Sequence, residues 1–248
     1  MTRIAAVGDV HVGTDSVDRV RPGFRHLDER ADLLLLAGDL TRCGDVREAE
    51  ILADELGDVH VPIVAVLGNH DHHGDRADDV VDVLTSAGVV VLDGTATVVD
   101  AAGTTVGVAG AKGFGGGFAG ACASAFGEPA MKAFVAETQG EAARLRQALA
   151  GLDTDHRVAL LHYAPVPETL QGERLEIYPF LGSYLLAEAV DAVGADLIVH
   201  GHAHHGSERG VTPGGTRVRN VAQPVIQHAY RIYDLRDPAW QSAAAAAG

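Results

Sequence analysis

The chain of 248 residues carries 19 basic and 34 acidic residues, for a formal net charge of −15, and 47% of its residues are hydrophobic. This length and apolar content fit one large domain, which we expect over residues 1–240, followed by a low-complexity tail over residues 241–248. The acidic surplus argues against an extended nucleic-acid interface, because such an interface needs clustered Lys and Arg and the only lysines are Lys112 and Lys132.

Two features of the sequence bear on where the protein works. No apolar run approaches the length of a membrane span, and no secretory leader precedes the first predicted strand at Arg3. The two cysteines, Cys43 and Cys122, fit no zinc-ligand or CxxC spacing, which is typical of free thiols in a reducing compartment. We therefore expect a cytoplasmic protein without membrane association. The sequence leaves open whether copies form a homo-oligomer.

The first part of the chain alternates buried strands with helices. Continuous apolar runs bounded by turn signals predict strands at residues 3–8, 32–37 and 63–67. Helical spacing of apolar residues predicts helices over residues 17–29, 45–56 and 77–86, although Pro22 and Gly23 interrupt the first near its start. Strand–helix units repeated three times imply parallel strands joined by right-handed crossovers.

The pattern changes after Gly88. Short β-type runs at residues 89–92, 96–100 and 104–109 are separated by Asp-Gly and Ala-Gly turns, which predict antiparallel hairpins and a second or mixed sheet. Residues 110–128 are rich in glycine and residues 163–182 contain three prolines, so both segments are predicted to be irregular. Such long loops in a compact domain are usually functional. Further helices are predicted over residues 129–150 and 183–193, and further strands over residues 157–161, 196–199, 216–221 and 228–235.

Five predicted strands end in side chains that can bind metal ions. These side chains are Asp9 and His11, Asp39, Asn69 and His70, His162, and His202 and His204. One such ending could be a polar turn after a core strand, and Asp9 could instead cap the segment that follows it. Five endings argue for a shared site, because buried polar groups are unfavourable without partners and α/β proteins place ligands beyond the carboxyl ends of their strands.

The residue types at these strand ends indicate metal ions. Two carboxylates, an amide oxygen and at least four imidazoles form a mixed set of oxygen and nitrogen ligands. Imidazole suits Zn, Fe, Ni and Cu, whereas carboxylate and amide oxygens favour Mn and Mg. The set is too large for one ion and about large enough for two, and a carboxylate such as Asp39 could bridge them. The neighbouring His200 is expected to pack or hydrogen-bond beside the site.

The order of these motifs resembles the calcineurin-like metallophosphoesterase superfamily. The motifs are Asp9-Val10-His11, Gly38-Asp39, Gly68-Asn69-His70-Asp71, His162 and Gly201-His202-Ala203-His204. The resemblance implies a mixed α/β fold in which two mixed β-sheets pack as a sandwich flanked by helices. It also implies two metal ions, Mn, Fe or Zn, one on Asp9, His11, Asp39 and His204 and the other on Asp39, Asn69, His162 and His202. One departure, Tyr163-Ala164-Pro165 after His162, leaves the subfamily open.

The same resemblance implies a phosphoesterase mechanism. A hydroxide bridging the two ions would attack phosphorus, His70 would contact the phosphate and protonate the leaving group, and Asp71 would orient His70. Asn69 would also lie beside the substrate. Arg42 and Lys112 lie in segments near the predicted site and could touch the phosphate.

The expected substrate is a small phosphate ester. Phosphodiesters are favoured, because the small single-domain plan with its GNHD motif resembles bacterial cyclic-nucleotide-type phosphodiesterases. The alternatives are a phosphomonoesterase acting on a nucleotide or small metabolite, and a non-catalytic scaffold on the same fold, which the intact ligand set disfavours. Residues 110–128 and 163–182 are expected to determine substrate choice.

Overall fold

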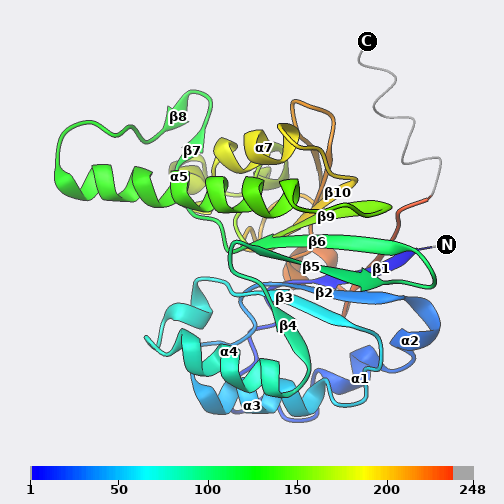
Figure 1. Ribbon diagram of the computed structural model, residues 1–248. Coiled ribbons are helices and arrows are strands. Elements are labelled where there is room, and N and C mark those ends of the chain that lie inside the picture. Colours follow the sequence, from blue (N-terminus) through cyan, green and yellow to red (C-terminus); the bar gives the residue numbers. More distant parts are fainter. Residues whose placement is uncertain (1, 237–248) are drawn as a thin grey trace.

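A computed structural model describes residues 2–236, so the predicted tail over residues 241–248 lies outside the described residues. Two mixed β-sheets pack face to face, and helices cover both outer faces (Figure 1). This four-layer arrangement confirms the predicted fold class. Among residues 2–236, none of the helices has the length and hydropathy needed to span a bilayer.

The first sheet has the strand order β13-β1-β2-β3-β4. Its parallel strands are β1 (Arg3–Val7), β2 (Leu33–Ala37), β3 (Ile63–Val66) and β4 (Val89–Val91), and β13 (Arg231–Asp234) pairs antiparallel with β1. Helices α3 (Val46–Glu55) and α4 (Ala77–Ser86) are the crossovers after β2 and β3 and lie below the sheet in Figure 1. The predicted parallel order of the first three strands is therefore confirmed, as are the helices after the second and third.

The second sheet has the strand order β11-β12-β10-β9-β6-β5. Its strands are β5 (Thr95–Asp100), β6 (Thr105–Ala111), β9 (His156–Leu161), β10 (Leu197–His200), β11 (Arg209–Val211) and β12 (Arg217–Asn220). Strands β6, β9, β10 and β12 run parallel, whereas β5 and β11 are antiparallel edges. Helices α5 (Pro129–Ala150) and α7 (Tyr184–Asp191) cover its outer face (Figure 1).

The core is divided by the alternation of side chains along the strands. Alternate residues of β1 and β2, such as Ile4 and Leu35, join Val108 and Leu160 of the second sheet in one buried layer between the sheets. The intervening residues, such as Leu34, pack instead beneath the helices of the first sheet. Strands buried on both faces need apolar residues at every position, which explains the continuous runs in the sequence.

One predicted helix is divided in the structure. Residues 17–29 form two short helices, α1 (Arg21–Phe24) and α2 (Leu27–Arg30), in place of one. Pro22 lies in the first turn of α1, the part of a helix that tolerates a residue without an N–H group. Between the two helices, His26 has φ of 60°, which is incompatible with a continuous right-handed helix.

The region after Gly88 differs from its prediction in two respects. Strands β5 and β6 form the expected antiparallel hairpin, but β4 pairs parallel with β3 and extends the first sheet. The glycine-rich segment contains a small hairpin, β7 (Gly117–Phe118) and β8 (Ala121–Cys122), where no strand was predicted. Strands of two or three residues contain too few side chains to show a periodicity, so their pairing is decided by their neighbours.

The second segment predicted to be irregular also contains short elements. Residues 163–182 include the turns η2 (Pro167–Leu170) and η3 (Leu175–Ile177) and helix α6 (Tyr178–Leu181). The two segments pack against each other, since Gly116 N donates to Pro179 O and Gly117 N donates to Gly182 O. Strand β11 and helix α8 (Gln223–Ile226) are further short elements that the sequence did not predict.

Candidate metal centre

The polar strand ends meet at one edge of the sandwich. Asp9 lies two residues after β1, Asp39 two residues after β2, and Asn69 three residues after β3. From the second sheet, His162 follows β9 directly and His202 lies two residues after β10. The seven predicted metal ligands are thus brought together from five strands of two sheets.

The side chains form two groups of potential metal-binding atoms. The first group is Asp9, His11, Asp39 and His204, and the second is Asp39, His162 and His202; in each, the ligand atoms lie within 4.8 Å of one another. Asn69 joins the second group, because its Oδ1 lies 3.0 Å from His162 Nε2. Asp39 is common to both groups, as expected of a bridging carboxylate.

The backbone is strained at four of these residues. Asp9, His11, Asp39 and His202 have φ of 59°, 44°, 50° and 68°, in the left-handed region that side-chain-bearing residues rarely adopt. Such conformations cost roughly 1–3 kcal/mol each and persist only where the surroundings enforce them. Here Asp9 N donates to Gly38 O over 2.9 Å and His11 N donates to Asp39 O over 3.0 Å. The fold therefore gives up stability to place these side chains.

Two glycines of the motifs are required by close approach to a neighbouring carboxylate. A Cβ atom on Gly68 would lie 2.1 Å from Asp39 Oδ1, and a Cβ atom on Gly201 would lie 2.3 Å from Asp9 Oδ2. Real Cβ atoms do not approach other atoms so closely. The glycine before Asn69 and the glycine before His202 thus make room for a ligand that comes from a different strand.

The arrangement around His162 fits a cation. Its Nδ1 lies 2.9 Å from Ala37 O, and since a carbonyl oxygen only accepts, Nδ1 carries the proton. The lone pair of Nε2 then faces Asp39 Oδ1 at 3.3 Å. Two acceptors that face each other in a buried site repel unless a positive charge lies between them. Burial lowers the pKa of His162 to about 3, so the ring is neutral at pH 7 and free to donate this lone pair to a metal ion.

Burial also controls the charge of the other donors. It lowers the pKa of His202 to about 3 and that of His11 to about 4, which leaves both rings neutral and able to bind metal. Burial raises the pKa of Asp9 to about 6, against the opposing effect of the hydrogen bond with His204 Nε2 at 2.9 Å. A buried carboxylate of this kind is stabilised by a nearby cation.

His70 lies beside the two ligand groups, against their shared Asp39. Its backbone N–H donates to Asp39 Oδ1 over 2.8 Å, and its Nε2 lies 3.9 Å from Asp39 Oδ2. Its Nδ1 donates to Arg42 O over 2.8 Å. The ring is therefore fixed by a backbone carbonyl, with Nε2 facing the centre.

Asp71, which the family resemblance assigns to orienting the His70 ring, joins two loops through its hydrogen bonds. Its Oδ1 accepts from the N–H and the hydroxyl of Thr41 at 2.7 and 2.6 Å, and its Oδ2 accepts from Gly68 N at 2.8 Å and Leu40 N at 3.1 Å. These bonds tie the loop after β2 to the loop after β3, which positions Asp39 against the Asn69 and His70 segment. The hydrogen bonds to both carboxylate oxygens come from the Leu40, Thr41 and Gly68 N–H groups and the Thr41 hydroxyl.

The two basic residues named from the sequence lie near the centre but have partners. Arg42 pairs with Asp15 Oδ1 at 2.8 Å, and together with Cys43, Asn69, His70 and His73 it lines a cavity of about 250 Å³. Lys112 Nζ donates to Gly113 O over 3.2 Å and lies over the rings of Phe114 and Tyr163. Both basic side chains therefore already have partners within the protein.

Two further residues complete the surroundings. His200 is buried, with Nδ1 2.8 Å from Gly201 O and Nε2 2.8 Å from Thr169 Oγ1, so it hydrogen-bonds beside the site as predicted. Sequence reasoning gave no role to Tyr163, whose ring centroid lies 4.4 Å from that of His202. Its position directly after His162 was the one signal that could have indicated this contact.

Comparison with known proteins agrees with this geometry. A family model described as calcineurin-like phosphoesterase matches residues 2–206. The chain belongs to the calcineurin-like phosphoesterase family. Members of this family generally bind two metal ions and act as hydrolases of phosphate esters, in keeping with the two groups of ligand atoms.

Similarity to individual proteins is more distant. No curated protein sequence matches the chain. Among solved structures, a phosphopantetheinyl hydrolase from Mycobacterium tuberculosis is similar with a TM-score of 0.68 and 18% identity, over 96% of this chain and 97% of that chain. The protein TT1561 of Thermus thermophilus is similar with a TM-score of 0.58 and 16% identity, over 95% of each chain. At these identities the similarities show the fold.

Proposed function

We propose that this chain is a dinuclear metal-dependent phosphoesterase that hydrolyses phosphodiesters. The observation that carries the proposal is the pair of ligand groups that share Asp39, with the His162 lone pair turned toward a carboxylate oxygen. One ion would be held by Asp9, His11, Asp39 and His204, and the other by Asp39, Asn69, His162 and His202. The chemistry that two such ions supply is neutralisation of the phosphoryl oxygens and a lower pKa for an attacking water.

His70 is suited to protonate the leaving alcohol. Its side chain is 44% exposed, so it can reach a substrate that lies over the centre. The Arg42 carbonyl holds Nδ1, which leaves Nε2 as the nitrogen that can hold and transfer a proton. A positioned histidine of this kind typically contributes a factor of about 10²–10⁴ to the rate.

The engaged basic side chains favour diesters over monoesters. A phosphomonoester dianion carries more negative charge than a diester monoanion and gains more from free cationic groups. Arg42 is instead paired with Asp15, and Lys112 lies over aromatic rings. A phosphomonoesterase acting on a nucleotide or small metabolite is the alternative. Because the fold is shared with a phosphopantetheinyl hydrolase, phosphopantetheinyl esters also belong in a substrate panel.

Metal analysis and a substrate panel test the proposal together. We expect the purified protein to hold about two transition-metal ions per chain and to hydrolyse bis(4-nitrophenyl) phosphate with Mn²⁺. We expect slower hydrolysis of 4-nitrophenyl phosphate under the same conditions. Faster hydrolysis of the monoester would favour the phosphomonoesterase. Absence of bound metal and of turnover with Mn²⁺, Fe²⁺ and Zn²⁺ would favour a non-catalytic scaffold.

A further inference from the structure

An apolar cavity of about 340 Å³ lies between the start of α5, strand β8 and helix α6. It is lined by Ala121, Cys122, Ala123, Met131, Phe134, Pro179 and Phe180, none of which is charged. Its volume falls within the range of small-molecule sites, which are mostly apolar. The cavity is formed by the two segments that the sequence predicted to determine substrate choice, together with the start of α5.

The wall of this cavity continues directly to the metal centre. Phe180 lines the cavity, while its carbonyl oxygen lies 3.3 Å from Nε2 of His202. A row of rings provides a second connection. The Tyr163 ring packs on His202, Phe114 lies 5.9 Å from Tyr163, and Phe134 of the cavity wall lies 5.1 Å from Phe114. Phe180 thus belongs both to the cavity wall and to the surroundings of His202 in the second ligand group.

The cavity wall also leaves large apolar side chains in contact with water. Phe180 is 61% exposed and Met131 is 40% exposed. Clustered exposed apolar surface beside a polar site often marks the place where a ligand binds, because the ligand removes that surface from water. Neither side chain is needed to fill the core, so their position fits a binding role.

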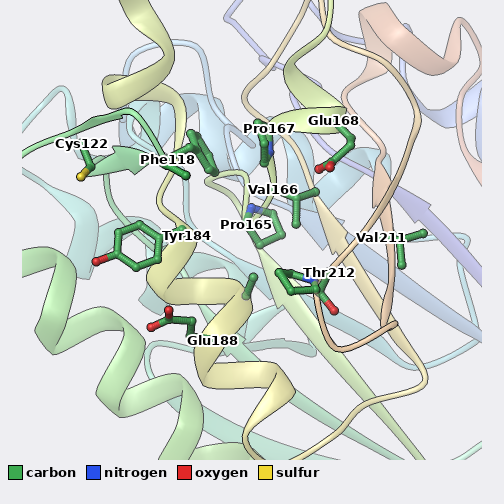
Figure 2. Close-up of a pocket in the computed structure, with 13 residues that line it drawn as sticks. Phe118, Cys122, Pro165, Val166, Pro167, Glu168, Tyr184, Glu188, Val211 and Thr212 are labelled. Carbon is green, nitrogen blue, oxygen red and sulfur yellow. The ribbon is translucent and has the colours of Figure 1, made fainter. Parts of the chain in front are cut away.

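A second, larger cavity, drawn in Figure 2, also has Cys122 among its lining residues. Its volume is about 690 Å³, and Figure 2 shows Phe118, Pro165 and Tyr184 among its apolar walls. It also contains the carboxylates of Glu168 and Glu188, which would repel a phosphate ester. The smaller cavity, uncharged and adjacent to His202, is the better match to a phosphate-linked group.

We propose that the cavity beside Phe180 binds an uncharged alkyl group esterified to the phosphate that the metal centre hydrolyses. The inference rests on the proposed phosphodiesterase function and narrows its substrates to diesters with one apolar alcohol. The apolar group would lie against Met131, Phe134 and Phe180, and the phosphate would lie over the metal centre.

The test compares methyl 4-nitrophenyl phosphate with hexyl 4-nitrophenyl phosphate, which release the same chromophore. The wild-type protein with Mn²⁺ should show a kcat/KM at least about tenfold higher for the hexyl ester. A fully buried methylene favours binding by roughly fourfold, and the cavity wall is partly exposed to water. Met131→Asp places a charge in the wall and should remove this preference. Met131 lies in the first turn of α5, where an acidic residue is compatible with the helix.

Phe126→Asp is the matched control. Phe126 is the most exposed aromatic residue of the described chain and lies five residues before Met131, but it does not line the cavity. The control adds the same charge nearby and should keep the preference for the hexyl ester. Equal kcat/KM for the two esters in the wild-type protein would overturn the inference and leave the phosphodiesterase proposal intact.

Binding measurements decide the inference if the phosphodiesterase proposal fails. If neither ester is hydrolysed with any metal, calorimetry with methylphosphonate and hexylphosphonate measures how much the hexyl chain adds to the binding affinity, without the need for turnover. Tighter binding of the hexyl compound, lost in Met131→Asp and kept in Phe126→Asp, would support an apolar subsite. Equal affinity for the two compounds would overturn it.

Discussion

Replacing Gly68 by alanine should disable the metal centre from a position that provides no ligand. The added Cβ would lie 2.1 Å from Asp39 Oδ1 and 2.3 Å from Asp39 N. Since real Cβ atoms stay at least 3.0 Å away, the carboxylate oxygen would have to retreat by about 0.9 Å. Metal–ligand distances tolerate only about 0.2 Å. Because Asp39 belongs to both ligand groups, one methyl group should weaken both metal sites.

The backbone offers little relief from this clash. Asp39 has φ of 50° and its carbonyl accepts from His11 N, so a shift of Asp39 N would disturb the first ligand group as well. Overpacking of this kind typically destabilises a protein by about 1–3 kcal/mol. We therefore expect a lower Tm together with metal affinity reduced at least about tenfold, which corresponds to about 1.4 kcal/mol.

Metal content after loading with Mn²⁺ and the Tm with and without Mn²⁺ are the measurements. Gly140→Ala is the control, because Gly140 lies inside α5 and an added Cβ there would meet only Arg144 Nη1 at 3.6 Å. It should keep wild-type metal content and gain about 0.5–1 kcal/mol of stability, as alanine does in helices. Wild-type metal content and a wild-type response of the Tm to Mn²⁺ in Gly68→Ala would refute the reasoning.

Three further substitutions separate the roles of individual side chains. His70→Gln should keep both metal ions while turnover falls by about 10²–10⁴, and a loss of metal would identify His70 as a ligand. Asp71→Asn should reduce the free energy of unfolding by about 1–3 kcal/mol, because an amide N–H would face Gly68 N. Reduced turnover at unchanged stability would instead support the predicted role of Asp71 in orienting the His70 ring. Glu55→Gln should lower the free energy of unfolding at pH 7 by about 1–3 kcal/mol, because the carboxylate accepts from the Asp18, Val20 and Arg21 N–H groups and glutamine keeps only one acceptor oxygen.

The Glu55 substitution also carries a pH dependence. Burial raises the pKa of Glu55, but the three backbone N–H groups outweigh it and hold the pKa below its ordinary value of 4.5. The ionised carboxylate therefore stabilises the fold fully above pH 4.5, and this contribution is lost as the pH falls through the lowered pKa. The stability difference between wild type and Glu55→Gln should narrow below pH 4.5 in urea unfolding. A difference that stays constant with pH would contradict this account.

Elements with strong local signals were predicted closely. Helices α4 and α5 have the bounds that were predicted, residues 77–86 and 129–150, and α3 begins after the cap Asp45, whose side chain accepts from Arg47 N. Apolar periodicity and capping act within a few residues, so the sequence alone contains this information. The edge at which the ligands meet could also be predicted, because strands joined by right-handed crossovers run parallel and present the same end.

Features that depend on distant partners could not be predicted in this way. Strand β4 was assigned to a hairpin, yet β3 provides its pairing edge, and β7–β8 gave no signal at all. Asp71 was assigned to the adjacent His70 ring, but Thr41, 30 residues away in the chain, supplies two of its donors. Strand pairing and buried hydrogen bonds join residues far apart in sequence, and a local pattern does not record which partner is nearest.

The sequence by itself therefore determined the order of the main strands and helices, the set of candidate metal-binding side chains and the family, because each depends on short motifs and local periodicity. Only the tertiary structure decided how those side chains share Asp39, why glycine stands before Asn69 and His202, and where the apolar cavity meets the metal centre. These features depend on the distances between atoms from different strands, which the packing of the two sheets fixes.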